Sequence, residues 1–390
     1  MGRAVIPAAA RQAILDVFGY TTLEVDEATG KRGNRLDKLE SLLCELTGAE
    51  GALVVNNNAA ATLLILAEMS KHGEEVIVAR GQLVEIGGSF RLPEVMEQAG
   101  IKLREIGTTN RVHYHDYENA VTENTAALMK IHPSNFKIVG FTSEVPISEL
   151  SEIAKKNNLP LIDDLGAGAF ADISRFGYEA EPLVSESIAD GADIVCSSGD
   201  KLVGGLQAGI IVGKKEWTDR LKKHPLYRAL RCDKITLTGL HATLQLFLDP
   251  DTLHKKNPTW YMMGIPESQS MEIAKIFART LKNTVKHLDV KLKRGFSELG
   301  SGSLPAEQIP TGLVAVTAEF LSSEELAQNL RCSDPPIFTR IEDDHVLFDV
   351  RTLQTGDHET IIHTLKTITG DKMTGSEKTT KRRTNSTGEK

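Results

Sequence analysis

Short apolar runs that alternate with longer amphipathic segments constrain the fold of this chain more than any other sequence feature. The runs Ala52–Val55 and Glu75–Ala79 are typical of buried strands, whereas residues 36–47 carry leucines at helical spacing and end at Gly48. Further strands are expected at 101–106, 125–131 and 159–162, with helices at 57–69 and 147–157. This repetition predicts an α/β fold with a mainly parallel sheet. Because ligands of such sheets bind at the carboxyl ends of the strands, the residues that follow each apolar run are the first candidates for a site.

A change of composition near residues 249–268 suggests a domain boundary, because Asp249-Pro250 and Asn257-Pro258 interrupt the pattern there. We expect a large domain over residues 1–255 and a small C-terminal α/β domain over 256–370. The small domain is expected to have helices at 268–286 and 358–367 and strands near 312–320, 336–341 and 345–350. The last stretch, 371–390, is polar and lacks apolar periodicity, so we expect a disordered basic tail. Its Lys381-Arg382-Arg383 cluster could contact RNA, and a solvated tail is the alternative.

Composition and cysteine usage narrow the class of protein. Of the 390 residues, 41% are hydrophobic and 25% charged, and no apolar run approaches the roughly 20 residues of a membrane span. Cys44, Cys196, Cys232 and Cys332 lack the spacing of a zinc site or a disulfide framework. With no signal-peptide core either, we expect a cytoplasmic protein with no bound metal and no membrane contact. The formal net charge of −8 gives no general bias towards nucleic acid, so an RNA contact would need a local basic patch.

Lys201 is the most informative single residue. It follows the apolar run 192–198 and precedes a glycine-rich turn and a second apolar run, Ile210–Val212, so it lies between two expected buried strands. Desolvation at such a turn lowers the pKa of an amine, which suits it to Schiff-base chemistry. We therefore predict that the stretch Ser198–Leu202 anchors pyridoxal 5'-phosphate, with Lys201 as the Schiff-base lysine and Ser198 as a cofactor contact. The alternative is a lysine whose side chain extends from the turn to solvent.

The turn after the strand at 52–55 is a candidate phosphate site. Asn57, Asn58 and Ala59 make this turn and open a helix. The backbone N–H groups and the dipole at such a helix start attract an anion, here the cofactor phosphate. An asparagine-rich helix cap without a ligand is the alternative. The position of the turn upstream of Lys201 favours the phosphate site.

Two acids, Asp163 and Asp164, follow the apolar run at 160–162. A buried acid at a strand end is costly unless it pairs with a cation, and the pyridinium nitrogen of the cofactor is such a cation. We assign this role to Asp163, the first acid after the run, and keep Asp164 as the alternative; either could instead cap a turn. The order of phosphate turn, strand-end aspartate and lysine is that of pyridoxal enzymes with the aspartate-aminotransferase fold, fold type I.

Arg228 and Arg231 are a candidate anion site. They lie three residues apart, so on one helical turn they would face the same side. Two guanidinium groups on one face suit a phosphate-like anion. The alternative is a solvated basic face.

Several longer motifs closely resemble bacterial selenocysteine synthase, the family of L-seryl-tRNA(Sec) selenium transferases. The similarity runs from residue 1 to about residue 370. The motifs are Ser198-Gly199-Asp200-Lys201-Leu202 with Gly204–Gly213, Glu85–Arg91, Gly107-Thr108-Thr109-Asn110-Arg111, Ser134–Phe141 and His224–Lys234.

The resemblance implies an aspartate-aminotransferase-like fold and the conversion of L-seryl-tRNA(Sec) to L-selenocysteinyl-tRNA(Sec) with selenophosphate, through a cofactor-bound aminoacrylyl intermediate, in selenocysteine biosynthesis. It implies that Lys201 is the base and that Asp200 is the essential acid beside it. The resemblance further implies that Arg3, Arg228 and Arg231 bind an anion. A homo-oligomer is also implied, at least a dimer and, in the family, a ring of dimers.

The chain departs from the family at its start. Members usually begin with a small helical tRNA-binding domain and then a strand that ends in Leu-Gly-Arg-Ala, whereas this chain opens at Met1-Gly2-Arg3-Ala4 within that motif. We expect a start assigned too far downstream, which the in-frame DNA before Met1 would decide. Two alternatives stay open: a pyridoxal phosphate-dependent lyase on a small amino acid or amino-sugar phosphate, and an inactive truncated synthase. The short start favours these, while Arg228, Arg231 and the full Ser198–Leu202 motif favour the synthase.

Overall fold

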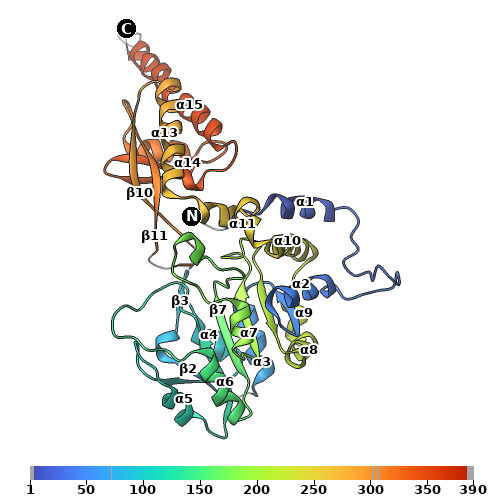
Figure 1. Ribbon diagram of the computed structural model, residues 1–390. Coiled ribbons are helices and arrows are strands. Elements are labelled where there is room, and N and C mark those ends of the chain that lie inside the picture. The colour runs from blue at the N-terminus through green and yellow to red at the C-terminus, as the bar shows by residue number, and fades with distance from the viewer. Residues whose placement is uncertain (1–3, 72, 301–302, 305–306, 384–390) are drawn as a thin grey trace, which may run out of the picture. The chain divides into compact units, whose positions relative to one another are not determined.

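Two compact units make up the chain in the computed structural model (Figure 1). The structure describes residues 4–71, 73–300, 303–304 and 307–383. The larger unit comprises Gly2–Gly264 with Leu299–Glu307, and the smaller unit comprises Ile265–Glu298 with the chain from Gln308 onward. Each unit has a hydrophobic core of its own.

Seven strands form the sheet of the larger unit, in the order β1-β9-β8-β7-β6-β2-β5. Strand β9 is antiparallel to both neighbours, and the other adjacent pairs are parallel. The strands are β1 (Gly51–Val55), β2 (Glu75–Ala79), β5 (Lys102–Ile106), β6 (Thr125–Ile131), β7 (Leu161–Gly166), β8 (Ile194–Ser198) and β9 (Gly209–Gly213). The predicted α/β fold with a mainly parallel sheet is confirmed. Because β6, β7 and β8 are parallel neighbours, their carboxyl ends lie side by side.

Helices connect these strands and cover the sheet (Figure 1). They are α1 (Ala8–Val17), α2 (Asp37–Thr47), α3 (Asn58–Met69), α4 (Leu92–Gln98), α5 (Tyr114–Ala120), α6 (Ile147–Lys156), α7 (Val184–Ala189), α8 (Lys215–Lys223), α9 (Pro225–Leu230), α10 (Lys234–Leu244), α11 (Pro250–Lys256) and α12 (Pro258–Gly264). Short 3-10 turns lie at η1 (Arg80–Gln82), η2 (Ser174–Phe176) and η3 (Gln245–Leu248), and a small hairpin joins β3 (Glu85–Ile86) to β4 (Phe90–Arg91). Helix α3 is alanine- and leucine-rich because it packs on β1, β8 and β9, where Leu64, Ile65 and Leu66 are fully buried.

The larger unit ends later than the sequence suggested. Composition placed the division after residue 255, whereas residues 256–264 belong to the larger unit. The reason is the packing of α12: Trp260 is fully buried, and its Nε1 donates a hydrogen bond of 2.8 Å to the carbonyl oxygen of Leu202. Asn257 likewise donates from Nδ2 to the carbonyl oxygen of Val203 at 2.9 Å. The prolines in this segment start helices α11 and α12 and do not mark a linker.

A four-stranded antiparallel sheet, in the order β10-β11-β13-β12, forms the smaller unit. Its strands are β10 (Leu288–Glu298), β11 (Gln308–Ala318), β12 (Arg340–Glu342) and β13 (His345–Asp349). Its helices are α13 (Glu267–Thr284), α14 (Ser323–Arg331) and α15 (Asp357–Arg383), with a 3-10 turn, η4, at Val350–Thr352. Strand β10 was not predicted from the sequence, although Leu288, Val290 and Leu292 alternate with polar residues at its start, as in a strand with one buried face.

Helix α15 extends into the stretch for which composition predicts disorder. It reaches Arg383, while residues 384–390 and the side chains from residue 371 onward lie outside the described part of the chain. The disorder of 371–390 and the RNA contact of its basic cluster therefore stay predictions.

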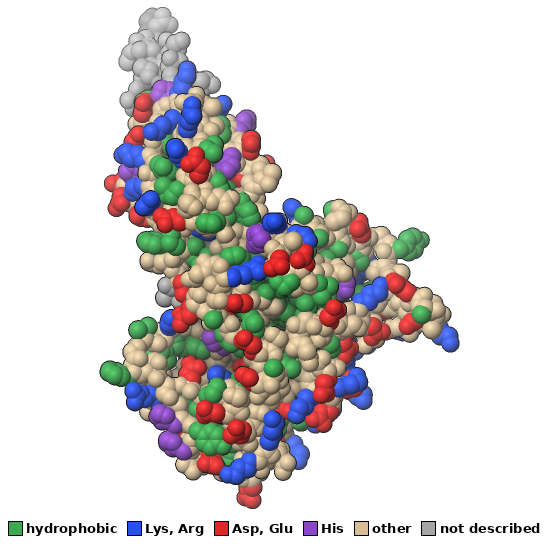
Figure 2. Space-filling model, in the orientation of Figure 1, with side chains coloured by type: hydrophobic (Ala, Val, Ile, Leu, Met, Phe, Trp, Pro, Cys, Tyr) green, Lys and Arg blue, Asp and Glu red, His purple; other side chains and the backbone are tan. Residues whose placement is uncertain are grey.

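Figure 2 shows basic and acidic side chains interspersed over the visible face, so no large area of one sign appears there. In the part of the chain that the structure describes, no helix combines the length and the apolar character needed to cross a membrane. The same described residues include no group of three or more His, Cys, Asp or Glu side chains that could hold a metal ion.

Candidate active site

A cavity of about 610 Å³ opens at the carboxyl ends of β1, β6, β7 and β8. It is lined by residues that come from the turns after these strands and from the start of α3. Among them are Asn57, Asn58, Ala59, Thr62, His132, Ser134, Asn135, Asp164, Ser198, Asp200, Lys201 and Gln207. Six of the residues predicted for the site therefore meet in one place: Asn57, Asn58, Ala59, Ser198, Asp200 and Lys201.

Lys201 lies on a tight turn between the antiparallel strands β8 and β9. The backbone N–H of Gly204 donates to the carbonyl oxygen of Lys201 at 2.9 Å, and Gly204 has the positive φ of +68° that favours glycine. A Cβ on Gly204 would come within 2.5 Å of Asn257 Oδ1. The two residues after Lys201 are fully buried, and their carbonyl oxygens accept the hydrogen bonds from α12 described above. The carbonyl groups of Lys201, Leu202 and Val203 thus each accept a hydrogen bond, which holds the turn after the lysine.

The start of α3 lies against the first residue of β9. Asn57 is the N-cap of α3, and its Oδ1 accepts a hydrogen bond of 2.8 Å from the N–H of Ala60. A Cβ on Gly209 would lie 2.2 Å from the carbonyl oxygen of Asn57, so only glycine allows this approach. The free N–H groups of the first helical turn border the cavity, as an anion site requires.

Asp164 is the carboxylate that faces this cavity. Its Oδ1 accepts hydrogen bonds from Asn58 Nδ2 at 2.8 Å and from the N–H of Gly166 at 3.1 Å, and its Oδ2 accepts one from Thr62 Oγ1 at 3.0 Å. Burial raises the pKa of this carboxyl group, while the three donors and the positive charge of Lys201 act to lower it. The effect of Lys201 agrees with the presence of both side chains at the cavity.

Asp163 does not reach the cavity. Strand β7 continues to Gly166 instead of ending at 162, so Asp163 and Asp164 are consecutive strand residues and point to opposite faces. Asp163 faces Ser187 of α7 and its strand neighbour Lys130. Burial raises its pKa to about 6, and its Oδ1 has no hydrogen-bond partner. The assignment to the first acid after the apolar run does not match this geometry, because it assumed that the strand ends before both acids.

The predicted arginines lie outside this cavity. Helix α9 ends at Leu230, and Arg231 has the extended conformation φ −63°, ψ 146°, so the two arginines do not share one helical turn as the sequence spacing suggested. Arg231 instead forms a β-bridge with Val55, at the end of β1. Arg228 is exposed. Arg3 lies outside the described residues.

Three cavity residues that the sequence reasoning missed follow strand β6. They are His132, Ser134 and Asn135. His132 Nε2 lies 3.0 Å from an oxygen of Glu181, and Asn135 Nδ2 donates to the carbonyl oxygen of Glu85 at 2.8 Å. The rule that ligands gather after parallel strands would have found them, since they come directly after the predicted strand at 125–131.

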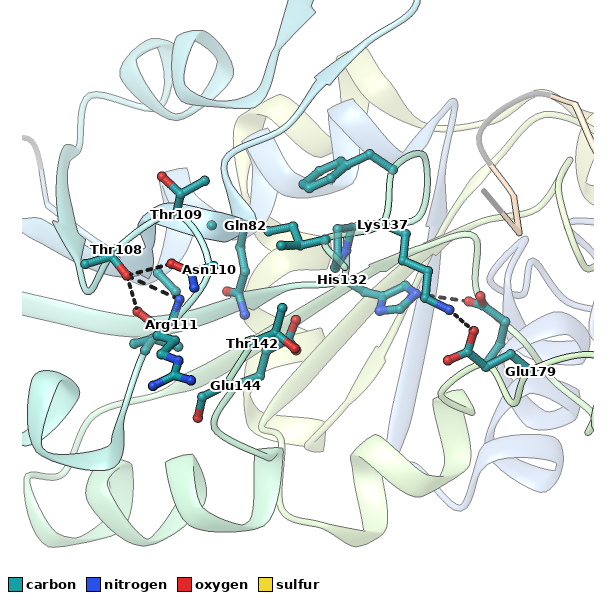
Figure 3. Close-up of a pocket in the computed structure, with 18 of the residues that line it drawn as sticks. Gln82, Thr108, Thr109, Asn110, Arg111, His132, Lys137, Thr142, Glu144 and Glu179 are labelled. Atoms are coloured by element: carbon teal, nitrogen blue, oxygen red, sulfur yellow. Dashed lines mark hydrogen bonds and ion pairs between the residues drawn. The ribbon is translucent and has the colours of Figure 1, made fainter. Parts of the chain in front are cut away.

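A second cavity, of about 250 Å³, shares His132 with the first. Figure 3 shows Thr108, Asn110 and Arg111 on one side of it and His132, Lys137 and Glu179 on the other. It therefore brings together two of the motifs that carry the family resemblance, at 107–111 and 134–141. These motifs also bind each other, since Arg111 Nε donates to the carbonyl oxygen of Phe141 at 3.2 Å.

Solved structures define the class of fold. The chain matches D-glucosaminate-6-phosphate ammonia-lyase with a TM-score of 0.62 at 19% identity, covering 94% of this chain and 92% of that one. It matches aspartate aminotransferase from Thermus thermophilus with a TM-score of 0.50 at 14% identity, covering 94% and 90%. The protein thus has the predicted aspartate-aminotransferase-like α/β fold.

Sequence comparisons identify the family. The family model described as SelA, L-seryl-tRNA selenium transferase, matches residues 1–354. The L-seryl-tRNA(Sec) selenium transferase of Alkaliphilus metalliredigens is 48% identical over 369 residues, 94% of this chain and 79% of that protein. That of Desulfovibrio desulfuricans is 49% identical over 94% of this chain and 78% of the relative. The chain belongs to the L-seryl-tRNA selenium transferase family. The fold and the family together imply pyridoxal phosphate as the cofactor.

Proposed function

We propose that this protein converts L-seryl-tRNA(Sec) to L-selenocysteinyl-tRNA(Sec) with selenophosphate as the selenium donor. The observation that carries the proposal is the identity of 48% over 94% of the chain to a selenium transferase, together with the cavity that holds Lys201 and Asp164. The 19% identity to the ammonia-lyase supports only a shared fold, so it does not favour the lyase alternative.

The residues of the cavity fit pyridoxal phosphate. Asp164 is a buried carboxylate that faces the cavity and is suited to a cationic ring nitrogen. The side-chain oxygens Asn58 Oδ1 and Asn135 Oδ1 are buried, have no hydrogen-bond partner and belong to residues that line the same cavity. Buried acceptors of this kind are expected to meet donors of a ligand. Lys201 and the first turn of α3 supply an amine and an anion site.

Each residue then has a distinct task. Lys201 would hold the cofactor as a Schiff base, and Asp164, in place of Asp163, would hold its ring nitrogen. The N–H groups at Asn58 and Ala59 would bind the phosphate. When bound, pyridoxal phosphate supplies an electron sink for the bonds at the substrate α-carbon. Lys201 Nζ, when it is a free neutral amine, would be the base that takes the proton from that carbon.

The remaining predicted residues act on the substrates. Asp200 is 8% exposed and borders the cavity beside Lys201, where a carboxylate can orient the amine or its ammonium form. Arg228 and Arg231 would bind the selenophosphate anion, as would Arg3. Since Arg228 and Arg231 lie outside the Lys201 cavity of their own chain, we propose that a second copy brings them to it, in a homo-oligomer that is at least a dimer. A cytoplasmic location follows from a substrate that is an aminoacyl-tRNA.

Conversion of seryl-tRNA(Sec) with selenophosphate tests the proposal directly. The protein loaded with pyridoxal phosphate should form selenocysteinyl-tRNA(Sec), and Lys201→Ala should lose both this activity and the visible absorbance of the bound cofactor. Lys275→Ala, which removes an exposed lysine of the smaller unit, serves as the matched control and should retain both. Turnover of free serine or of an amino-sugar phosphate, with none of the tRNA, would overturn the proposal. An unchanged spectrum in Lys201→Ala would refute the anchor.

A further inference from the structure

Helix α3 carries two side chains that hold the carboxylate of Asp164. Asn58 and Thr62 lie one helical turn apart, and each donates one hydrogen bond to a different oxygen of Asp164, at 2.8 and 3.0 Å. We propose that Asn58 and Thr62 are positioning residues that keep Asp164 ionised and aim one acceptor position at the cationic ring nitrogen of the cofactor. This inference rests on the proposed function, because it presumes that pyridoxal phosphate occupies the cavity.

The hydrogen-bond count on Asp164 leaves a single position for a strong donor. Each carboxylate oxygen accepts about two hydrogen bonds. Oδ1 already accepts from the amide of Asn58 and from the N–H of Gly166, so it is fully used. Oδ2 accepts from Thr62 Oγ1. The carboxylate otherwise meets the buried thiol of Cys196, a weak donor that a cationic ring nitrogen can replace. Asn58 Nδ2 and the N–H of Gly166 can only donate hydrogen bonds. A proton on Oδ1 would therefore find no acceptor in either group, so both favour the ionised carboxylate.

The neighbouring acid, Asp163, shows what the hydrogen bonds from Asn58 and Thr62 add at Asp164. Asp163 and Asp164 are both buried, at 1% and 4% exposure, in the same strand. Asp163 has one side-chain donor, Ser187, and one of its oxygens has no partner. Asp164 accepts from Asn58 and Thr62 of α3 and from the N–H of Gly166, and the thiol of Cys196 also interacts with it. The additional donors offset the desolvation of a carboxylate that must stay ionised to bind a cation.

The same helix also borders the phosphate end of the cavity. Asn57, Asn58 and Ala59 open α3, and Thr62 follows one turn later. The side chain of Asn58 therefore holds Asp164, while its backbone N–H belongs to the first turn of α3, which borders the phosphate end. Because α3 is buried along its length, one rigid helix fixes the distance between the phosphate site and the ring-nitrogen partner.

The test compares Thr62→Val with Thr62→Ser. Valine keeps the volume and shape of threonine but removes the hydroxyl group, whereas serine retains it. In Thr62→Val the affinity of the apo-protein for pyridoxal phosphate, measured by absorbance titration, should fall roughly tenfold, because Asp164 loses a donor that keeps it ionised. The pH dependence of the absorbance of the bound cofactor should shift as well, because the ring nitrogen loses part of its partner's charge. Thr62→Ser should restore both.

Thr369→Val is the matched control. Thr369 is likewise buried in a helix and donates to the carbonyl oxygen four residues before it, at 2.9 Å, but it lies in α15 of the smaller unit. It should leave the affinity and the pH profile unchanged. If the Thr62→Val protein binds the cofactor as tightly as the wild type, with the same pH profile, the positioning role is overturned and the proposed function stays intact. A wild-type protein that does not bind pyridoxal phosphate at all would overturn both.

Discussion

Asp163 and Asp164 are consecutive residues whose carboxylates lie on opposite faces of the central sheet. One meets Ser187 of α7, and the other meets Asn58 and Thr62 of α3 at the Lys201 cavity. The strand period of two places a single acid at the cavity and leaves the other inside the protein. This relationship gives the two acids different roles that substitution can separate.

Replacing each acid by asparagine should affect the cofactor in only one case. Asp164→Asn removes the charge that pairs with the ring nitrogen, so we expect the affinity for pyridoxal phosphate to fall by at least about tenfold. Asp163→Asn should bind the cofactor like the wild type, because Asp163 lies outside the cavity. Absorbance titration of the two apo-proteins measures both affinities. If Asp163→Asn weakened cofactor binding and Asp164→Asn did not, Asp163 would be the partner of the ring nitrogen.

The stability of the apo-protein should depend on pH through Asp163. Its pKa is raised from 3.8 to about 6 in the folded state, so the folded protein keeps a proton that the unfolded chain releases between these values. The contribution of protonated Asp163 to the free energy of unfolding is present below about pH 4 and is lost as the pH rises through about 6. Full ionisation of Asp163 lowers the free energy of unfolding by roughly 3 kcal/mol. Asp163→Asn does not ionise, so we expect it to gain stability relative to the wild type as the pH rises from 4 to 6.

Urea denaturation of both proteins at several pH values measures this difference. Comparing the two proteins at each pH removes the contribution of all other titrating groups, since these are common to both. The advantage of Asp163→Asn at pH 8 should be about 1–2 kcal/mol, because the asparagine must still satisfy its own polar atoms. A difference that stays constant across the range would show that Asp163 is not protonated in the folded protein.

The sequence was sufficient for the fold class because the strand runs are apolar and the turns after them carry distinctive residues. Lys201, Asn57, Asn58 and Ala59 lie at one cavity, as expected for residues that follow strands of the sheet. Strand β10 was missed although Leu288, Val290 and Leu292 alternate with polar residues, and this alternation ends where Arg294 and Gly295 follow.

Other parts of the site depend on contacts that sequence spacing does not contain. The choice between Asp163 and Asp164 depends on where β7 ends, and strand ends are the least certain part of a sequence-based assignment. Thr62 reaches Asp164 across more than a hundred residues of sequence. The spacing of Arg228 and Arg231 suggested one helical face, but the helix ends between them.

Gly209→Ala should damage both folding and cofactor binding. The added Cβ would lie 2.2 Å from the carbonyl oxygen of Asn57, so β9 and the start of α3 would have to separate. We expect a loss of stability of about 1–3 kcal/mol, typical of overpacking, and weaker binding of pyridoxal phosphate. Gly19→Ala is the control, because its Cβ would meet nothing closer than 3.5 Å. Equal behaviour of the two variants in thermal denaturation would contradict the close approach.

Trp260→Phe should loosen the Lys201 turn. It keeps the aromatic packing but removes the Nε1 donor, which leaves the buried carbonyl oxygen of Leu202 without its partner. We expect a loss of about 1–3 kcal/mol in urea denaturation and faster hydrogen exchange at residues 201–205. The other tryptophan gives the control: Trp217 is half-buried and packs under Arg220, and since phenylalanine keeps an aromatic ring there, Trp217→Phe should cost less than about 1 kcal/mol. Unchanged exchange in Trp260→Phe would show that α12 does not hold the turn.

Mixing two inactive variants should restore activity if a second copy completes the site. Lys201→Ala lacks the proposed anchor and Arg228→Ala lacks a proposed anion ligand, so each alone should fail to make selenocysteinyl-tRNA(Sec). When the two chains are expressed together, a mixed dimer has one site with both residues intact and one site with neither, provided that the arginine acts on the cavity of the partner. Random pairing makes about half of the dimers mixed, so we expect about a quarter of the wild-type activity per site.

If Lys201 and Arg228 serve the same site from one chain, mixed dimers contain no intact site and no activity returns. Coexpression of Lys201→Ala with Asp164→Asn is the control, because both residues belong to one cavity and the mixture should stay inactive.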